Sequence, residues 1–135
     1  MNIIVDTCVW SLALRRKTAG PIPPVVIELQ SLVLDGRVQM IGAIRQELLS
    51  GIKPGQQFKK LEAHLRSFPD LPSTTEDHVL AAKYFNMCRT KGVQGSNTDF
   101  LICAMAVNHK LPIFTSDEDF SYFAKHLPVT LHSID

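Results

Sequence analysis

The stretch Ile3-Ile4-Val5-Asp6-Thr7 places an acid directly after three apolar β-forming residues. A short apolar run of this kind is typical of a buried strand in a parallel sheet. Residues 111–117 repeat the arrangement near the other end of the chain and bring Asp117 to the end of a second apolar run. Ligands bind outside the carboxyl ends of parallel strands, so we expect Asp6 and Asp117 to meet in space.

Short apolar runs alternate with longer helical patterns along the chain, which predicts an α/β fold with a parallel sheet of about five short strands. The expected strands cover residues 2–6, 38–41, 71–74, 111–115 and 129–131. The expected helices cover residues 7–17, 23–35, 42–50, 54–67, 76–91 and 98–109, with a short helix ending at residue 123. Residues 18–24, rich in glycine and proline, are expected to form a surface loop.

Composition favours one folded domain over residues 1–135, because 45% of the chain is hydrophobic and only 20% is charged. The cysteines lack CxxC spacing and lie in apolar segments, so we expect reduced core residues of a cytoplasmic protein at Cys8, Cys88 and Cys103. No signal peptide or membrane span is expected. A net charge of +1 excludes a strongly basic field, so a nucleic acid would be held by local charges and bound cations.

Two further acids, Asp99 and Glu47, could complete a metal site with Asp6 and Asp117. Asp99 follows a turn that resembles an N-cap, at residues 95–98, and precedes an apolar helix. Magnesium and manganese prefer carboxylate oxygens, which these four residues supply. Each acid also has an ordinary interpretation: Asp6 and Asp99 as helix caps, and Glu47 as a solvated helical residue.

The segment after the strand at 111–115 contains three consecutive acids at residues 117–119. We favour Asp117 as the metal ligand because it is nearest the strand end, and we expect Asp119 to cap the following short helix. Thr115 and Ser116 could hold a carboxylate or a metal-bound water by hydrogen bonds, or could be ordinary turn residues.

Four sequence blocks together resemble the PIN-domain (PilT N-terminus) ribonuclease family, and in particular its VapC toxin branch. In chain order they are Ile3 to Thr7 with Trp10 shortly after, Glu47 to Gly51, Asn97 to Ala104, and Phe114 to Phe120. All four acids are present in the family's order, and the resemblance runs from residue 2 to about residue 123.

The resemblance implies that Asp6, Glu47, Asp99 and Asp117 form the catalytic metal site, with Thr115 as a supporting hydroxyl. It also implies a three-layer α/β/α sandwich around a twisted sheet. The implied activity is RNA cleavage that depends on Mg²⁺, for which Mn²⁺ can substitute. The implied partners are a VapB-type antitoxin encoded beside the toxin and a second copy of the chain in a homodimer.

Basic residues near the predicted site are candidates for binding RNA phosphates, chiefly Arg15, Arg45 and Arg89. Lys53 and Lys91, together with residues 16–17, are weaker candidates. A solvated surface is the ordinary interpretation for most of them. The five histidines share no motif, and the hypothesis needs none as a catalytic base.

Three other classes of function compete with a ribonuclease. A phosphoacceptor receiver domain would need paired acids after the first strand and a lysine near the last strand, and neither is present. A PIN-like scaffold that binds partners without cleaving them is disfavoured because all four acids are retained. A DNA-directed nuclease would use the same metal chemistry, but the chain is small for the additional elements that such substrates require.

Overall fold

The computed structural model describes residues 1–15 and 20–134 and confirms the predicted α/β class. Within this range the strands are β1 (Ile3–Val5), β2 (Val38–Ile41), β3 (Asp70–Leu71) and β4 (Ile113–Phe114). The helices are α1 (Thr7–Leu14), α2 (Pro24–Leu34), α3 (Gly42–Leu49), α4 (Gln56–Leu65), α5 (Thr75–Thr90), α6 (Asn97–His109) and α7 (Asp119–Phe123). The expected continuation of the first helix over residues 16–17 and the start of the loop at residues 18–19 lie outside the described residues.

The four strands form one parallel sheet in the order β3-β2-β1-β4. Ile4 of β1 pairs with Gln39 on one side and with Ile113 on the other, so β1 is a central strand. Consequently the carboxyl ends of β1 and β4 lie side by side, with Asp6 and Thr115 directly after them.

Only β2 has the predicted bounds, and the other four predicted strands are shorter than expected. Residues 129–131 form only a single parallel bridge, between Leu131 and Ile113, because Ile113 alone exchanges backbone hydrogen bonds with this segment, through Thr130 and His132. The strand expected at 71–74 is limited to β3, since Pro72 has no N–H to continue the ladder. The described sheet therefore has four strands rather than five.

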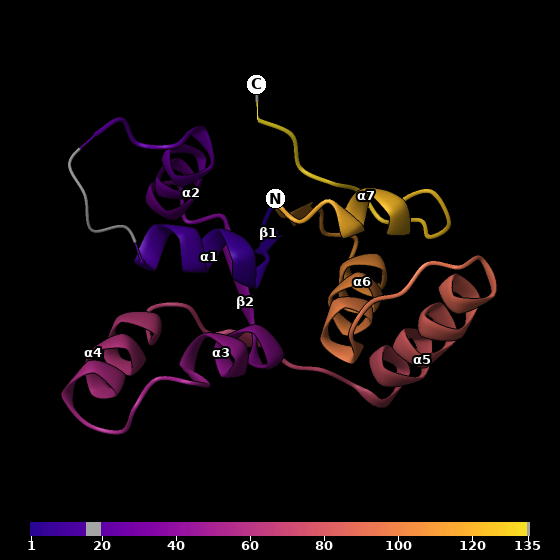
Figure 1. Cartoon of the computed structure of the whole chain (residues 1–135), viewed down its shortest axis with the longest axis horizontal. Helices are drawn as coiled ribbons and strands as arrows, with labels where there is room; N and C mark the ends of the chain where they lie inside the picture. Colours follow the sequence, from indigo (N-terminus) through magenta and orange to yellow (C-terminus); the bar gives the residue numbers. More distant parts are fainter. Residues whose placement is uncertain (16–19, 135) are drawn as a thin grey trace.

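The helices form two layers on opposite sides of the sheet (Figure 1), as in a three-layer sandwich. In this view α1, α2 and α4 lie to the left of β1 and β2, α3 lies below β2, and α5 to α7 lie to the right. Between residues 1–15 and 20–134, no helix is both long and apolar enough to cross a membrane.

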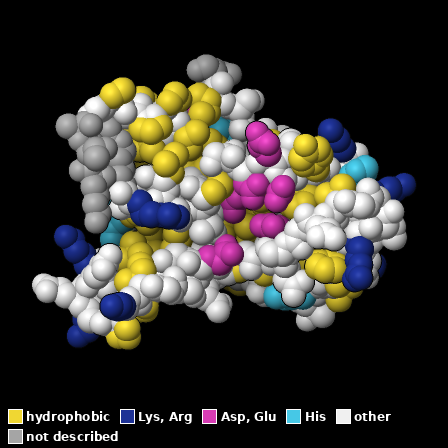
Figure 2. Space-filling view, viewed as in Figure 1, with side chains coloured by type: hydrophobic (Ala, Val, Ile, Leu, Met, Phe, Trp, Pro, Cys, Tyr) yellow, Lys and Arg dark blue, Asp and Glu magenta, His cyan; other side chains and the backbone are white. Residues whose placement is uncertain are grey.

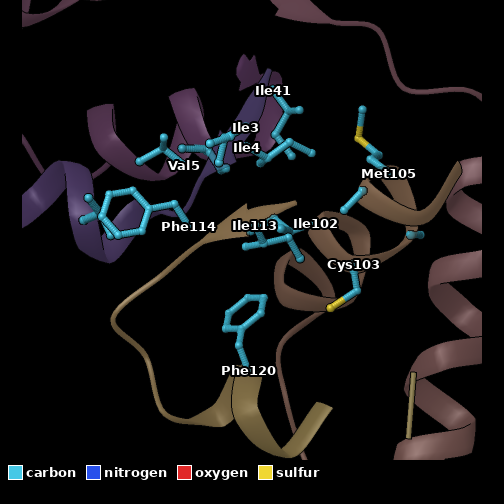
Figure 3. Close-up of a cluster of buried hydrophobic side chains, with 14 of the residues drawn as sticks. Ile3, Ile4, Val5, Ile41, Ile102, Cys103, Met105, Ile113, Phe114 and Phe120 are labelled. Atoms are coloured by element: carbon cyan, nitrogen blue, oxygen red, sulfur yellow. The ribbon is translucent and has the colours of Figure 1, made fainter. Parts of the chain in front are cut away.

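The core forms where β1 meets the apolar helix α6 (Figure 3). Ile3, Ile4 and Val5 are completely buried, which explains why the first strand has no alternation of polar residues. Ile102 and Met105 of α6 point toward the sheet in the same region.

The three cysteines are all free of disulfides, but only two of them belong to the core. Cys88 and Cys103 are buried, as predicted, and burial raises the pKa of both thiols above the ordinary value. Cys8 is half-buried, packs against the core and lies beside Asp6, so it stands at the edge of the core rather than inside it.

Arg45 joins α3 to the end of α4 and to β3. Its guanidinium donates hydrogen bonds to the backbone oxygens of Leu65, at 3.0 Å, and Phe68. It also pairs with Asp70, with 2.9 Å between Nη2 and Oδ1. The side chain that we considered as an RNA contact thus has its donors committed to the fold.

Arg45→Ala should destabilise the protein by about 2 kcal/mol, because two backbone oxygens and one carboxylate lose their donor. Urea denaturation measures this difference. Arg66→Ala is the matched control, since Arg66 forms only an exposed pair with Glu62 on α4 and should change stability by less than about 0.5 kcal/mol. Equal effects of the two substitutions would contradict the structural role of Arg45.

Candidate metal centre

Asp6 is the most enclosed of the four candidate ligands, with only 5% of its surface exposed. It is the N-cap residue of α1, and its Oδ1 accepts a 2.8 Å hydrogen bond from the Thr7 N–H. Its Oδ2 accepts a 2.8 Å hydrogen bond from the Thr115 hydroxyl. Asp6 therefore has the helix-cap role, which is compatible with a place in the predicted metal site.

Glu47 reaches the same region from α3 through Thr7. The Thr7 hydroxyl donates to Glu47 Oε1 at 2.6 Å, while the Thr7 N–H holds Asp6. Thr7, the first residue of α1, therefore orients two acids that are far apart in sequence. The Glu47 side chain is exposed, and its other oxygen accepts no hydrogen bond within the described chain.

Asp117 is placed by the turn that follows β4. Its N–H donates to the Thr115 hydroxyl at 3.0 Å, and its Oδ1 accepts from the Asp119 N–H at 2.9 Å. This last bond shows that Asp117, not Asp119, satisfies an N–H at the start of α7. The Asp119 carboxylate itself is exposed, and we find no hydrogen-bond partner for it among the described residues.

Asp99 belongs to a capping box at the start of α6, as the turn before it predicts. Its Oδ2 accepts a 3.0 Å hydrogen bond from the Ser96 N–H, while the Ser96 hydroxyl accepts from the Asp99 N–H. Gly95, just before this turn, lies against Phe100 and Phe123 so closely that a Cβ would stand 2.6 Å from the Phe123 ring. Aromatic packing therefore fixes the loop that delivers Asp99.

These carboxylates form an acidic group with which no basic side chain pairs among the described residues. Figure 2 shows acidic side chains gathered near the centre of one face of the molecule. Burial raises the pKa of Asp6 above its ordinary value, although hydrogen bonds from Thr115, Cys8 and Thr7 partly oppose the effect, and the Asp117 charge adds to it. Within residues 1–15 and 20–134, none of the four acids forms an ion pair.

The chemistry of this donor set fits a hard divalent cation. All four side chains offer oxygen ligands, and Glu47, Asp99 and Asp117 each keep one carboxylate oxygen without a hydrogen bond in the described chain. Among the residues that the structure describes, no three Asp, Glu, His or Cys side chains yet converge into a coordination shell. Binding an ion would therefore require the carboxylates to rotate toward one another.

Ser116 and the candidate RNA-binding arginines differ in how they relate to this centre. Ser116 hydrogen-bonds to Cys8 Sγ, at 3.3 Å from its hydroxyl, and to none of the acids. Arg15 ends α1 and lines a groove together with Glu47. Arg89 is exposed in the last turn of α5, and in the described structure it forms no ion pair with an acid.

Sequence reasoning missed Thr7 and Cys8 as parts of the site. Cys8 Sγ lies 3.3 Å from Asp6 Oδ2 and 3.4 Å from the Thr115 hydroxyl. The position of Thr7 directly after Asp6 could have indicated that it belongs to the site. The sequence does not indicate that the Thr7 side chain points toward α3.

A parallel α/β fold with acids gathered at the carboxyl edge of its sheet defines a class of proteins suited to metal-dependent chemistry. The sequence model of the PIN domain matches residues 3–126, and the chain belongs to the PIN-domain family. No curated protein matches the sequence significantly.

Solved structures of similar fold come from several bacteria. FitAcB from Neisseria gonorrhoeae is 26% identical, with a TM-score of 0.75 over 97% of this chain and 96% of that chain. VapBC2 from Rickettsia felis, bound to a promoter DNA fragment, is 18% identical, with a TM-score of 0.73 over 100% of both chains. VapBC-1 from nontypeable Haemophilus influenzae is 16% identical, with a TM-score of 0.73 over 98% of both chains.

Asp99→Asn should raise the melting temperature by a few degrees at neutral pH in EDTA. Burial raises the pKa of Asp99 above 3.8, hydrogen bonds from Ser96 oppose the shift, and the charges of Asp6 and Asp117 add to it. A raised carboxyl pKa contributes stability below the unfolded value, and this stability is lost as pH rises through the folded value. The gain should therefore shrink as pH falls toward 3.8.

Asparagine keeps an oxygen for the Ser96 N–H, so the helix cap survives the substitution. Magnesium should raise the melting temperature of the wild type more than that of the variant. A variant that melts below the wild type at neutral pH would contradict charge repulsion at this centre.

Proposed function

We propose that this chain is a divalent-metal-dependent endoribonuclease and the toxin of a type II toxin-antitoxin module. The observation that carries the proposal is the unneutralised acidic group, in which the nearly buried Asp6 lies among Glu47, Asp99 and Asp117 at the carboxyl edge of the sheet. PIN domains are generally nucleases, and this chain belongs to that family.

Asp6, Glu47, Asp99 and Asp117 would hold Mg²⁺, with Mn²⁺ as a substitute. When bound, the divalent ion supplies Lewis-acid activation for hydrolysis of a phosphodiester bond. Thr7 holds Asp6 and Glu47 in place for this purpose, and Thr115 holds Asp6 while it accepts from the backbone at Asp117.

The chain's own histidines do not serve as the base in this proposal. His132 Nε2 is 2.5 Å from Glu28 Oε2, and His78 Nε2 is 3.2 Å from the Ser73 hydroxyl oxygen. His109 Nε2 is 3.9 Å from Oδ2 of the buried Asp77. In the described part of the chain, no histidine pairs with the four acids. The carboxylates are therefore the groups available to accept a proton near the substrate.

RNA is the favoured substrate over DNA because the four sequence blocks resemble those of VapC toxins. With a net charge of +1, the protein has no global field to attract long polyanions. A bound cation and a few local basic groups suit short, single-stranded segments of an RNA.

Purified protein with Mg²⁺ should cut a subset of a total RNA sample into discrete fragments, and EDTA should abolish cleavage. Asp6→Asn and Asp99→Asn should each reduce cleavage at least a hundredfold, because each removes a metal-binding charge. Glu76→Gln, an exposed acid on α5, is the matched control and should retain full activity. Gel electrophoresis of the RNA measures the outcome.

Single-stranded and duplex DNA run in parallel discriminate the alternatives. Cleavage of DNA but not RNA would replace the proposal by a DNA-directed nuclease. A folded protein that binds Mg²⁺ but cleaves neither would favour a non-catalytic scaffold.

The antitoxin would occupy a groove of about 970 Å³ between α1, α3 and α4. Apolar walls come from Leu14, Leu48 and Leu61, while Glu47 reaches the groove from the acidic centre. Arg15 and Lys60 also line it. This combination fits an amphipathic antitoxin segment that carries an acid for the basic wall and an arginine that reaches Glu47. The structural neighbours named VapBC and FitAcB support a partner of this kind.

Leu14→Asp should weaken binding of the antitoxin encoded by the neighbouring gene at least tenfold, because a charge would then enter the apolar wall. Leu14 is 38% exposed, so the substitution should leave folding intact. The matched control is Val79→Asp on α5, at a site 50% exposed and outside the groove. Calorimetry that gives equal affinities for both variants would exclude the groove as the antitoxin site.

A further inference from the structure

Helix α7 connects the acidic centre to an exposed aromatic side chain. Asp119 is the first residue of α7, and its N–H is bound to Asp117. Tyr122 follows three residues later, so it lies on the same side of the helix as Asp119. Its side chain is 49% exposed, although most large aromatic residues of this protein are buried.

The inner side of α7 is anchored in the core. Phe120 and Phe123 are completely buried, and their rings stand 5.1 Å apart. Phe123 also packs on Phe100 of α6, with 4.9 Å between ring centroids. This anchoring fixes α7 relative to Asp99, which directly precedes Phe100, and so holds the exposed ring on a helix whose first residue is bound by Asp117.

A lysine stands over the exposed ring. Lys125 Nζ lies 4.9 Å from the centroid of Tyr122, within the range of a cation-π contact. Lys125 forms no ion pair within the described residues, so its charge is not neutralised by a carboxylate. Figure 2 shows hydrophobic and basic side chains over α7 on the same face as the acidic group.

We propose that Tyr122 and Lys125 form a nucleotide-binding platform beside the metal centre, where Tyr122 stacks on a base of the single-stranded substrate and Lys125 binds a neighbouring phosphate. An exposed, rigidly held aromatic ring next to an unpaired cation matches the two chemical parts of a nucleotide. The acids cannot attract phosphates by themselves, so a cation at their edge provides part of the missing attraction. The proposal rests on the proposed ribonuclease function.

Binding is measured by fluorescence anisotropy with a labelled short single-stranded RNA of mixed sequence, in an Asp99→Asn background that prevents cleavage. Tyr122→Ala should weaken binding about tenfold, because a stacked base contributes roughly 1–3 kcal/mol. Tyr122→Trp should retain binding, since it keeps an aromatic face. Met87→Ala on α5, at a site 44% exposed, is the matched control and should bind as the parent does.

Lys125→Gln should weaken binding at low salt and lower the slope of log Kd against log salt by about 0.7, the value for one phosphate contact on a single strand. Lys83→Gln, an exposed lysine on α5, should leave the slope unchanged. Melting temperatures of all variants establish that they remain folded.

The platform proposal would be wrong if the parent and Tyr122→Ala bound the RNA with equal affinity. It would also be wrong if Tyr122→Ala and Tyr122→Trp weakened RNA binding equally. If the wild type still cleaves RNA in that case, the ribonuclease proposal stands and only the platform fails. If the wild type neither binds nor cleaves RNA, the proposed function fails and the platform fails with it.

Discussion

The crowding of carboxylates at one edge of the sheet is the constraint on which the rest of the structure depends. Asp6 is nearly buried, and the Asp117 charge contributes to raising the pKa of both Asp6 and Asp99. Such a group destabilises a folded chain unless hydrogen bonds or a cation compensate it. Thr7 provides hydrogen bonds from the start of α1, just beyond β1, and Thr115 provides one from the position directly after β4. The parallel pairing of these two strands therefore determines whether the centre can exist.

The apolar parts of the molecule provide the rigidity that this centre requires. A completely buried β1 packs against α6, and α6 carries Asp99 in its first turn. Contacts between aromatic rings then connect α6 to α7, next to Asp117. Hydrophobic packing thus holds the strands and helices that carry the carboxylates in place against the repulsion between their charges. This arrangement is common at functional sites.

The surroundings of the acidic centre differ on its two sides. Toward α1, α3 and α4 there is an apolar groove that includes Glu47, and this shape suits a protein segment. Toward α7 there is an exposed ring with a lysine over it, and this chemistry suits a nucleotide. Under the proposed function, a partner in the groove and a substrate on α7 would both approach the same carboxylates.

The sequence by itself determined the features that depend on local spacing. Apolar runs followed by acids identified β1 and β4, and the spacing of Ser96 and Asp99 produced the capping box that the structure contains. Only the tertiary structure decided where long side chains point. Arg45 could have faced an RNA, but its guanidinium binds backbone oxygens near the end of α4, and Thr7 reaches across to Glu47 on α3. Local hydrogen bonds and periodicity are encoded within a few residues, whereas these contacts exist only after helices and strands distant in sequence have packed together.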